Sequence, residues 1–192
     1  ECLDNMPWRS LKGLGDMAPD FLRLGDFKNV RLKDDTLVQF RIIGFKHDVT
    51  KSGRILPLTW EMVDCLPNRH RWNSNDTNRG SWGATELFHK MNDEDGVIYQ
   101  LMPDEILEVV EPVIKLTANT YDGANCSKRS ASFGLSLKKK PLDGTSIRHR
   151  AKVIGTNITG KKMSLGARSV MVPLSTLCCV LLFATTAAPS AL

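Results

Sequence analysis

Side chains that could do chemistry gather in two short stretches of the chain. In the first, His47 and Asp48 are adjacent, and a His–carboxylate pair is a candidate for acid–base work or metal binding. The strand pattern before them, however, places neighbouring side chains on opposite faces of a strand, so the two cannot readily share one ligand. We expect instead that Asp48 bonds nearby backbone amides in a turn, as short acidic side chains commonly do.

The second stretch offers amide and carboxylate oxygens at Asn73, Asn75, Asp76 and Asn78. Oxygen ligands in a loop suit calcium, but the spacing differs from that of an EF-hand loop, and no bidentate glutamate stands at the expected end. Asn side chains also stabilise loops by bonding their own backbone. We favour this second interpretation over a calcium site.

Two tryptophans, Trp72 and Trp82, flank the Asn-rich loop. An indole ring can stack on a sugar, but such residues more often anchor a core with one polar edge, and we expect that role here. His70 and His89 have no third partner in the pattern, and there is no His-Glu-x-x-His motif. Because no set of nucleophile, base and orienting residue is present, we expect no enzymatic activity, no catalytic residues, and no metal or cofactor.

The five cysteines do not form a recognisable site. None stands in a Cys-x-x-Cys pair, so zinc and thioredoxin-like sites have no support. An odd number with one adjacent pair is also a poor disulfide framework, and we expect free thiols. The cysteines are Cys2, Cys65, Cys126, Cys178 and Cys179.

Hydrophobic periodicity predicts the elements that must position these residues. Residues 27–33 and 37–45 alternate between apolar and polar side chains, and Asp34 and Asp35 between them favour a turn, so we expect a β-hairpin. Residues 55–63 are apolar enough for a buried strand. The side chains expected in the core from these strands are Val38, Phe40, Ile42 and Trp60.

Two short helices should follow. The first covers residues 84–91, with Glu86 in its first turn, where the helix dipole favours a negative charge. The second begins at Pro103 and is stopped by Pro112. Its apolar stripe is expected to face the same core and consists of Ile106, Val109 and Val110. Residues 113–116 could then re-enter the sheet.

Charge and aromatic content change abruptly near residue 125. Residues 1–125 have 15 Lys and Arg against 20 Asp and Glu, whereas residues 126–192 have 11 against one. All Trp and Tyr precede the change, and only Phe133 and Phe183 follow it. We therefore expect a lead-in segment at residues 1–24, an α+β domain at residues 25–125, and a basic, then apolar segment at residues 126–192. That last segment is expected to be divergent, poorly ordered or out of frame.

The apolar terminus raises a membrane hypothesis. Residues 169–192 have no charge and are long enough to cross a bilayer. Two prolines and many small polar residues weaken this interpretation, so we favour a buried or misassigned strand, densest at residues 177–184. No secretory signal opens the chain as given, because charged residues and prolines interrupt any apolar run near residue 1.

Several motifs occur in order between residues 25 and 116. They are Ile-Ile-Gly-Phe-x-His-Asp at residues 42–48, a second strand at 58–66, Asn-Ser-x-x-Thr-Asn within 72–78, and Ser-Trp-Gly at 81–83. A Leu-Pro-helix-Pro-Val-x-Lys element is at residues 101–115, with Met102 inserted before Pro103. Together they resemble a family of phage and bacterial surface modules, known as a domain of unknown function and related to the C-type-lectin-like fold.

The resemblance implies an α+β, C-type-lectin-like domain with an N-terminal β-hairpin, two short helices and a small mixed sheet. It also implies a non-enzymatic module that binds or displays a ligand on a phage virion or bacterial cell surface, similar to targets of diversity-generating retroelements. The ligand would be an unidentified surface protein or glycan. The alternatives are a protein anchored in a membrane by residues 169–192, or a nucleic-acid-binding protein with a basic tail. Neither membrane nor nucleic acid is the expected partner.

The resemblance fades after residue 125. Family members continue with a Leu-Leu-Ser-Glu-like strand, a Trp-Trp-Leu-Arg-Ser-like motif and an aromatic, Asn-rich closing segment, which contains the ligand-contacting residues. Here only residues 133–137 and 167–169 are similar to that pattern. No ligand-binding residue is therefore carried over, and we expect the closing strands to be missing and the core half covered.

Overall fold

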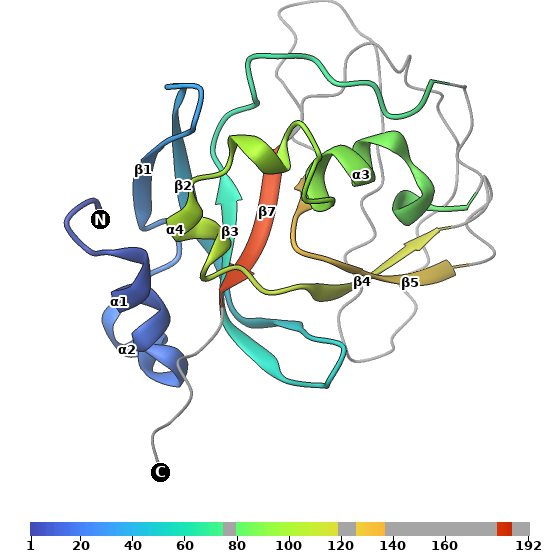
Figure 1. Cartoon of the computed structure of the whole chain (residues 1–192). Helices are drawn as coiled ribbons and strands as arrows, with labels where there is room; N and C mark the ends of the chain where they lie inside the picture. Colours follow the sequence, from blue (N-terminus) through green and yellow to red (C-terminus); the bar gives the residue numbers. More distant parts are fainter. Residues whose placement is uncertain (75–79, 119–125, 137–179, 186–192) are drawn as a thin grey trace, which may run out of the picture.

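A five-stranded sheet organises the computed structural model, which describes residues 1–74, 80–118, 126–136 and 180–185 (Figure 1). The strand order is β1-β2-β3-β7-β6, and β4 and β5 form a separate two-stranded ribbon. The five strands are β1 (Phe27–Arg31), β2 (Leu37–Val49), β3 (Ile55–Met62), β6 (Gly134–Ser136) and β7 (Val180–Thr185). The ribbon pairs β4 (Val113–Ala118) with β5 (Cys126–Ala131).

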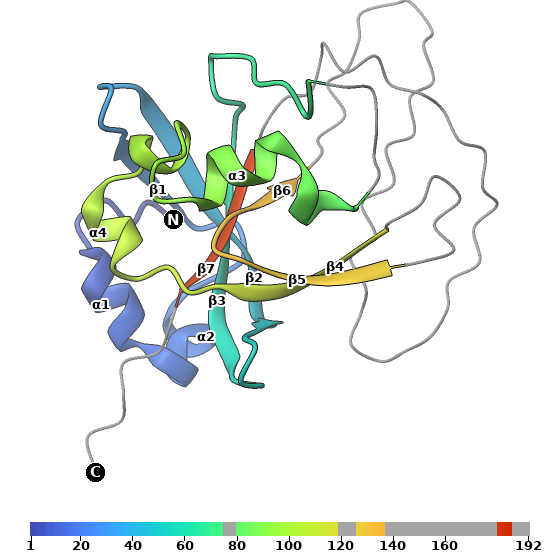
Figure 2. The ribbon, with the colours of Figure 1, turned by 45° about the vertical axis from the view of Figure 1, so that its right-hand side comes forward.

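Short helices surround the sheet (Figure 2). At one end lie α1 (Trp8–Gly13), η1 (Gly15–Met17) and α2 (Ala18–Phe21). The other helical segments are η2 (Trp82–Ala84), α3 (Glu86–Asn92), η3 (Tyr99–Leu101) and α4 (Asp104–Leu107). The predicted α+β class and both predicted helices are confirmed, although α4 is a single turn of four residues. Pro103 precedes it as the N-cap residue, where its missing N–H leaves no helical bond unmade.

The predicted hairpin is confirmed as β1 and β2, and the predicted buried strand as β3. The expected mixed sheet is not found, because every pairing between the described strands is antiparallel. Residues 113–116 do not re-enter the main sheet either. They belong to β4, whose Val113 forms one bridge with Thr50, the residue that follows β2.

One core contains the predicted inward-facing residues. Phe40, Ile42 and Trp60 are at most 1% exposed, Val38 is 9% exposed, and all pack together. From the α4 region, Ile106 and Val109 are fully buried and Val110 is partly buried against them. The expectation that the strand pattern and the helical stripe face one core is therefore confirmed.

Strand β7 lies inside this sheet, between β3 and β6. Phe183 is 2% exposed, and its ring centroid lies 5.1 Å from that of Phe40, 5.7 Å from Trp8 and 6.0 Å from Phe133. The expectation of a buried strand in the apolar terminus is confirmed for residues 180–185. Residues 169–179 and 186–192 lie outside the described part of the chain.

The core thus draws residues from all three predicted segments of the chain. Trp8 comes from the lead-in segment, Phe40 from the middle segment, and Phe133 and Phe183 from beyond residue 125. The expectation that the closing strands are missing is wrong for residues 126–136 and 180–185. The change in charge and aromatic content after residue 125 gave no sign of these strands, because a short central strand needs only a few apolar residues and no charge.

In the described part of the chain, no helix has the length and apolar composition that crossing a bilayer requires.

Cys2 is a free, exposed thiol, whereas Cys65 is disulfide-bonded. The expectation of free thiols is therefore wrong at Cys65.

Candidate functional site

A β-bulge in β2 decides where the predicted His–carboxylate pair points. Between the paired residues Phe45 and Asp48, two residues of β2, Lys46 and His47, lie opposite a single residue of β3, Pro57. Proline has no N–H for the ladder, and Lys46 adopts a φ of 51°, which is uncommon outside glycine. The extra residue breaks the regular alternation of the strand.

As a result, Asp48 is buried among side chains. Its Oδ2 accepts a hydrogen bond of 2.8 Å from Thr59 Oγ1, and its Oδ1 accepts one from Lys115 Nζ of β4. His47 Nδ1 lies 3.4 Å from the same Oδ1. The expected turn, with Asp48 bonded to backbone amides, is therefore wrong. The expectation that His47 and Asp48 point apart is also wrong, because it assumed an unbroken strand.

The electrostatics of this cluster favour a structural role. Burial raises the pKa of Asp48, but the charge and hydrogen bond of Lys115, with the hydrogen bond from Thr59, outweigh it and hold that pKa below its ordinary value. The carboxylate is therefore ionised and paired at neutral pH. A proton-transfer group works best with a pKa near the working pH. Lys115 and Asp48 instead tie the β4–β5 ribbon to the main sheet.

The two tryptophans anchor the segment that connects β3 to α3, on either side of its Asn-rich part. Trp82 is 6% exposed and belongs to the core, with its ring centroid 5.2 Å from that of the partly buried Trp72 and 5.6 Å from Phe88. The backbone carbonyl of Trp72 accepts a hydrogen bond from Leu87 N of α3. The expected role of Trp72 and Trp82 as anchors is confirmed.

Reciprocal hydrogen bonds hold the loop to the first turn of α3. Asn73 Oδ1 accepts from Glu86 N at 2.9 Å, and Glu86 Oε1 accepts from Ser74 N at 2.7 Å. Thr85 caps the helix by accepting from Phe88 N through its hydroxyl. Asn73 thus bonds the backbone, as the favoured interpretation of the Asn series expected. Asn75, Asp76 and Asn78 lie outside the described residues.

A cleft of about 310 Å³ lies where this loop leaves the sheet. Its walls come from the β1–β2 hairpin and from the first residues after β3. In Figure 1, the chain runs from the end of β3 along the top of the molecule towards α3. The lining residues are Asn29, Thr36, Leu37, Val38, Gln39, Asp64, Cys65 and Pro67.

The cleft combines polar groups with accessible apolar surface. Asn29 is held in place, since its Nδ2 donates to Asp4 and its Oδ1 accepts from Gln39 Nε2 at 3.2 Å. Leu37 is 63% exposed at the rim. Few placed polar groups beside apolar surface are typical of ligand pockets, and this volume is at the small end of their range. Sequence reasoning did not find this site, because its residues are far apart in the chain.

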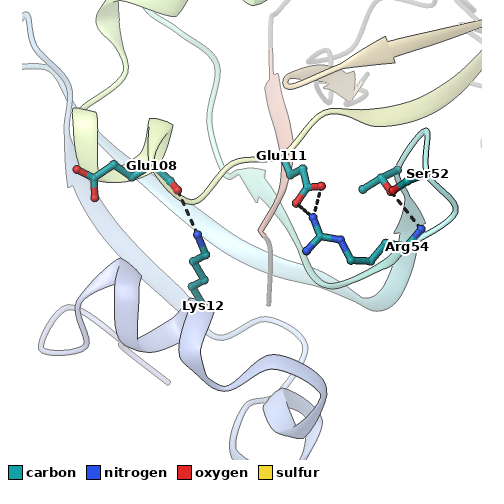
Figure 3. A network of polar contacts seen from close by, with 6 residues as sticks. Lys12, Ser52, Arg54, Glu108 and Glu111 are labelled. Atoms are coloured by element: carbon teal, nitrogen blue, oxygen red, sulfur yellow. Dashed lines mark hydrogen bonds and ion pairs between the residues drawn. The ribbon is translucent and has the colours of Figure 1, made fainter. Parts of the chain in front are cut away.

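A second hollow of about 470 Å³ lies beside the ribbon, and structural ion pairs occupy its surroundings. Glu111, one of its lining residues, is paired with Arg54 of the β2–β3 hairpin (Figure 3). The backbone carbonyl of Glu108 accepts from Lys12 Nζ of α1 at 3.4 Å. These contacts hold the α4–β4 connection in place. The carboxylate of Glu111 is already paired with Arg54.

Asn92, at the end of α3, is a positioning residue that sequence reasoning missed. Its Oδ1 accepts from Ser132 N and Phe133 N at 2.8 and 3.0 Å. Its Nδ2 donates to the carbonyls of Phe88 and Phe133. One amide side chain thus fixes the turn between β5 and β6 against α3. Only the fold brings these residues together.

The remaining histidines do not form a shared site. His89 Nδ1 lies 2.8 Å from Asp93 Oδ2 on the exposed side of α3, and burial, with the nearby Lys90, lowers the pKa of His70. Among the described residues, no group of three or more His, Cys, Asp or Glu side chains is placed to hold a metal.

Comparison of the chain with protein-family models, with curated proteins and with solved structures found no match.

Proposed function

We propose that this protein is a non-enzymatic ligand-binding module of a phage or bacterial surface protein. The observation that carries the proposal is the cleft between the β1–β2 hairpin and the loop after β3, beside a loop that is anchored at its far end. A rigid frame that presents an irregular loop is the common arrangement of binding proteins. The ordered motifs between residues 25 and 116 add support, since they resemble a family of display modules.

The proposed ligand is a surface protein or glycan that contacts Leu37, Gln39 and Asp64 at the cleft. Leu37 offers apolar contact, and the amide and carboxylate groups offer hydrogen bonds. The disulfide at Cys65, which lines the same cleft, is consistent with an oxidising location such as a virion or cell surface.

The alternatives have less support. Residues 180–185 pair with β3 and β6, so this part of the proposed membrane anchor is a strand of the main sheet. For nucleic acid, the described part of the basic tail supplies Lys128 and Arg129 on β5, both exposed. Binding to DNA that weakens steeply with added salt would favour this alternative over a cleft ligand.

The test uses the full chain, labelled and applied to bacterial cells and to an array of bacterial surface glycans. We expect Leu37→Asp to weaken the binding at least tenfold, because it places a charge on the apolar rim of the cleft. The matched control is Ile55→Asp, since Ile55 is 54% exposed and lies away from the cleft. Binding that both variants retain equally would remove the cleft from the site, and no binding by the wild-type chain would contradict the proposed function.

A further inference from the structure

The second hollow, beside the β4–β5 ribbon, is lined by three segments that are far apart in the chain. The bridge between Thr50 and Val113, and the pairing of Val113 with Ala131, place the tip of the β2–β3 hairpin next to the start of β4 and the end of β5. Hydroxyl groups predominate in the lining, and none of its side chains is aromatic. The lining residues are Thr50, Lys51, Ser52, Glu111, Pro112 and Ser130.

A buried threonine supports the hydroxyl group of Ser52. Thr50 is 5% exposed, and its Oγ1 accepts a hydrogen bond of 3.1 Å from Arg54 N. The Oγ1 atom of Thr50 and the Oγ atom of Ser52 lie 2.8 Å apart, and either can donate. Because a hydroxyl both donates and accepts, Ser52 can donate to an anion in the hollow while it accepts from Thr50. Its bond to Thr50 is therefore kept when a ligand binds.

The charge around the hollow is positive. Glu111 is the one acid of its lining, and both carboxylate oxygens accept from Arg54 Nη2 (Figure 3). This pairing offsets the negative charge of Glu111. Lys51 also lines the hollow, and Lys128 lies on the same side of β5 as Ser130, two residues away. Within the described part of the chain, neither lysine takes part in an ion pair.

Groups of this kind bind an oxyanion. Lys51 supplies a positive charge, and Ser52 and Ser130 supply O–H donors, which are common partners of phosphate oxygens. The exposed Pro112 adds an apolar surface against which the C–H face of a sugar ring can pack. A lining without aromatic side chains offers nothing on which a nucleic-acid base would stack. The hollow therefore favours a sugar phosphate over a nucleotide.

We propose that this hollow binds the phosphate group of a phosphorylated glycan, with Lys51 and Ser52 at the phosphate and Pro112 against the sugar. Its volume of about 470 Å³ suits such a ligand, since small-molecule sites commonly measure about 300–1,000 Å³. The site is additional to the cleft and does not rest on the proposed function. Leu37, the first residue of β2, lines the cleft, whereas Thr50, which follows the last residue of that strand, lines the hollow.

Titration calorimetry of the full chain, in a phosphate-free buffer of low ionic strength, tests the proposal. The probes are a mannan that carries phosphate, the same mannan after removal of the phosphate, inorganic phosphate and a single-stranded oligonucleotide. We expect the phosphorylated mannan to bind most tightly, because it alone offers both the charge and the sugar contact without bases to place. Equal affinity for the two mannans, or affinity for inorganic phosphate or the oligonucleotide that matches the phosphorylated mannan, would overturn the proposal.

Variants of the lining locate the binding. Lys51→Gln should weaken binding of the phosphorylated mannan by roughly fivefold or more, because it removes a charge that faces the phosphate. Ser52→Ala should weaken it by roughly threefold or more, because it removes a donor. Lys33→Gln is the matched control, since Lys33 is exposed and lies at the opposite end of β2. An equal loss in Lys33→Gln and Lys51→Gln would refute the site, because net charge alone would then explain the binding.

Failure of this site is distinguishable from failure of the proposed function. Leu37→Asp changes the rim of the cleft and should bind the phosphorylated mannan as the wild type does. Unchanged thermal midpoints would show that the variants fold. If Leu37→Asp weakens this binding and Lys51→Gln does not, the phosphate is bound in the cleft and the hollow is not a site.

Discussion

The surroundings of Asp48 give this carboxylate a structural role and not a catalytic one. The same carboxylate that invites a catalytic interpretation in the sequence is buried, ionised and paired with Lys115 in the fold. We expect Asp48→Asn to lower the free energy of unfolding at neutral pH by about 1–3 kcal/mol, because the variant keeps an acceptor for Thr59 but leaves Lys115 without its counter-charge.

The pH dependence of this loss has a definite sign. The pKa of Asp48 is lowered by folding, so its contribution is complete above the unfolded value of about 3.9 and is lost as the pH falls through the lower folded value. In urea unfolding, the difference between wild type and Asp48→Asn should be constant above about pH 5 and shrink below about pH 4. A difference that stays the same in strong acid would show that the lost stability is not due to charge. Asp95→Asn, at an exposed position outside this cluster, is the control.

At the scale of elements, two glycines in or beside helices give predictions of opposite sign. A Cβ at Gly96 would lie 2.6 Å from the backbone oxygens of His89 and Lys90, because the chain turns back tightly onto the end of α3. Gly96→Ala should therefore destabilise the protein by about 1–3 kcal/mol. Gly13, the last residue of α1, has open space around the same position. Gly13→Ala should stabilise the protein by about 0.5–1 kcal/mol.

Thermal unfolding of both glycine variants checks these values. Each variant adds one methyl group to the chain, so the pair separates the local geometry from the chemistry of the substitution. If Gly96→Ala unfolds at the same temperature as the wild type, the segment after α3 does not pack as described here. Loss of stability in Gly13→Ala would mean that α1 ends before Gly13.

At the scale of the whole molecule, Phe183 decides whether the terminus belongs to the core. We expect Phe183→Ala and Phe40→Ala each to lower the free energy of unfolding by about 3–5 kcal/mol, since both rings are buried. Their effects should not add, because the two rings are in contact. Ile55→Ala, at an exposed position, should change stability by less than about 0.5 kcal/mol. If Phe40→Ala lowers the free energy of unfolding and Phe183→Ala does not, residues 180–185 do not pack in the core.

Local patterns explain which parts of the fold were predictable. The alternation around Phe40 and the prolines around α4 act over a few residues, so they predict a hairpin, a buried strand and a helix. The bulge at Lys46 has no such pattern, and it reversed the expectation for His47 and Asp48. Distant pairing is also invisible in a local pattern.

The candidate site follows the same division. Trp72 and Trp82 were predicted as anchors because large aromatic residues beside a loop usually pack inwards. The cleft needs the ends of β1, β2 and β3 to meet, and no spacing in the chain encodes that meeting.

The position of β7 has a consequence for synthesis on the ribosome. The strand that fills the place between β3 and β6 is made from residues 180–185, which are translated long after β3. Until then, β3 has an open edge and its backbone hydrogen-bonding groups have no partner on that side. Contacts between residues so far apart in the chain also form slowly. The nascent chain therefore stays aggregation-prone until residues 180–185 have been translated, and a chaperone would be needed most before that point.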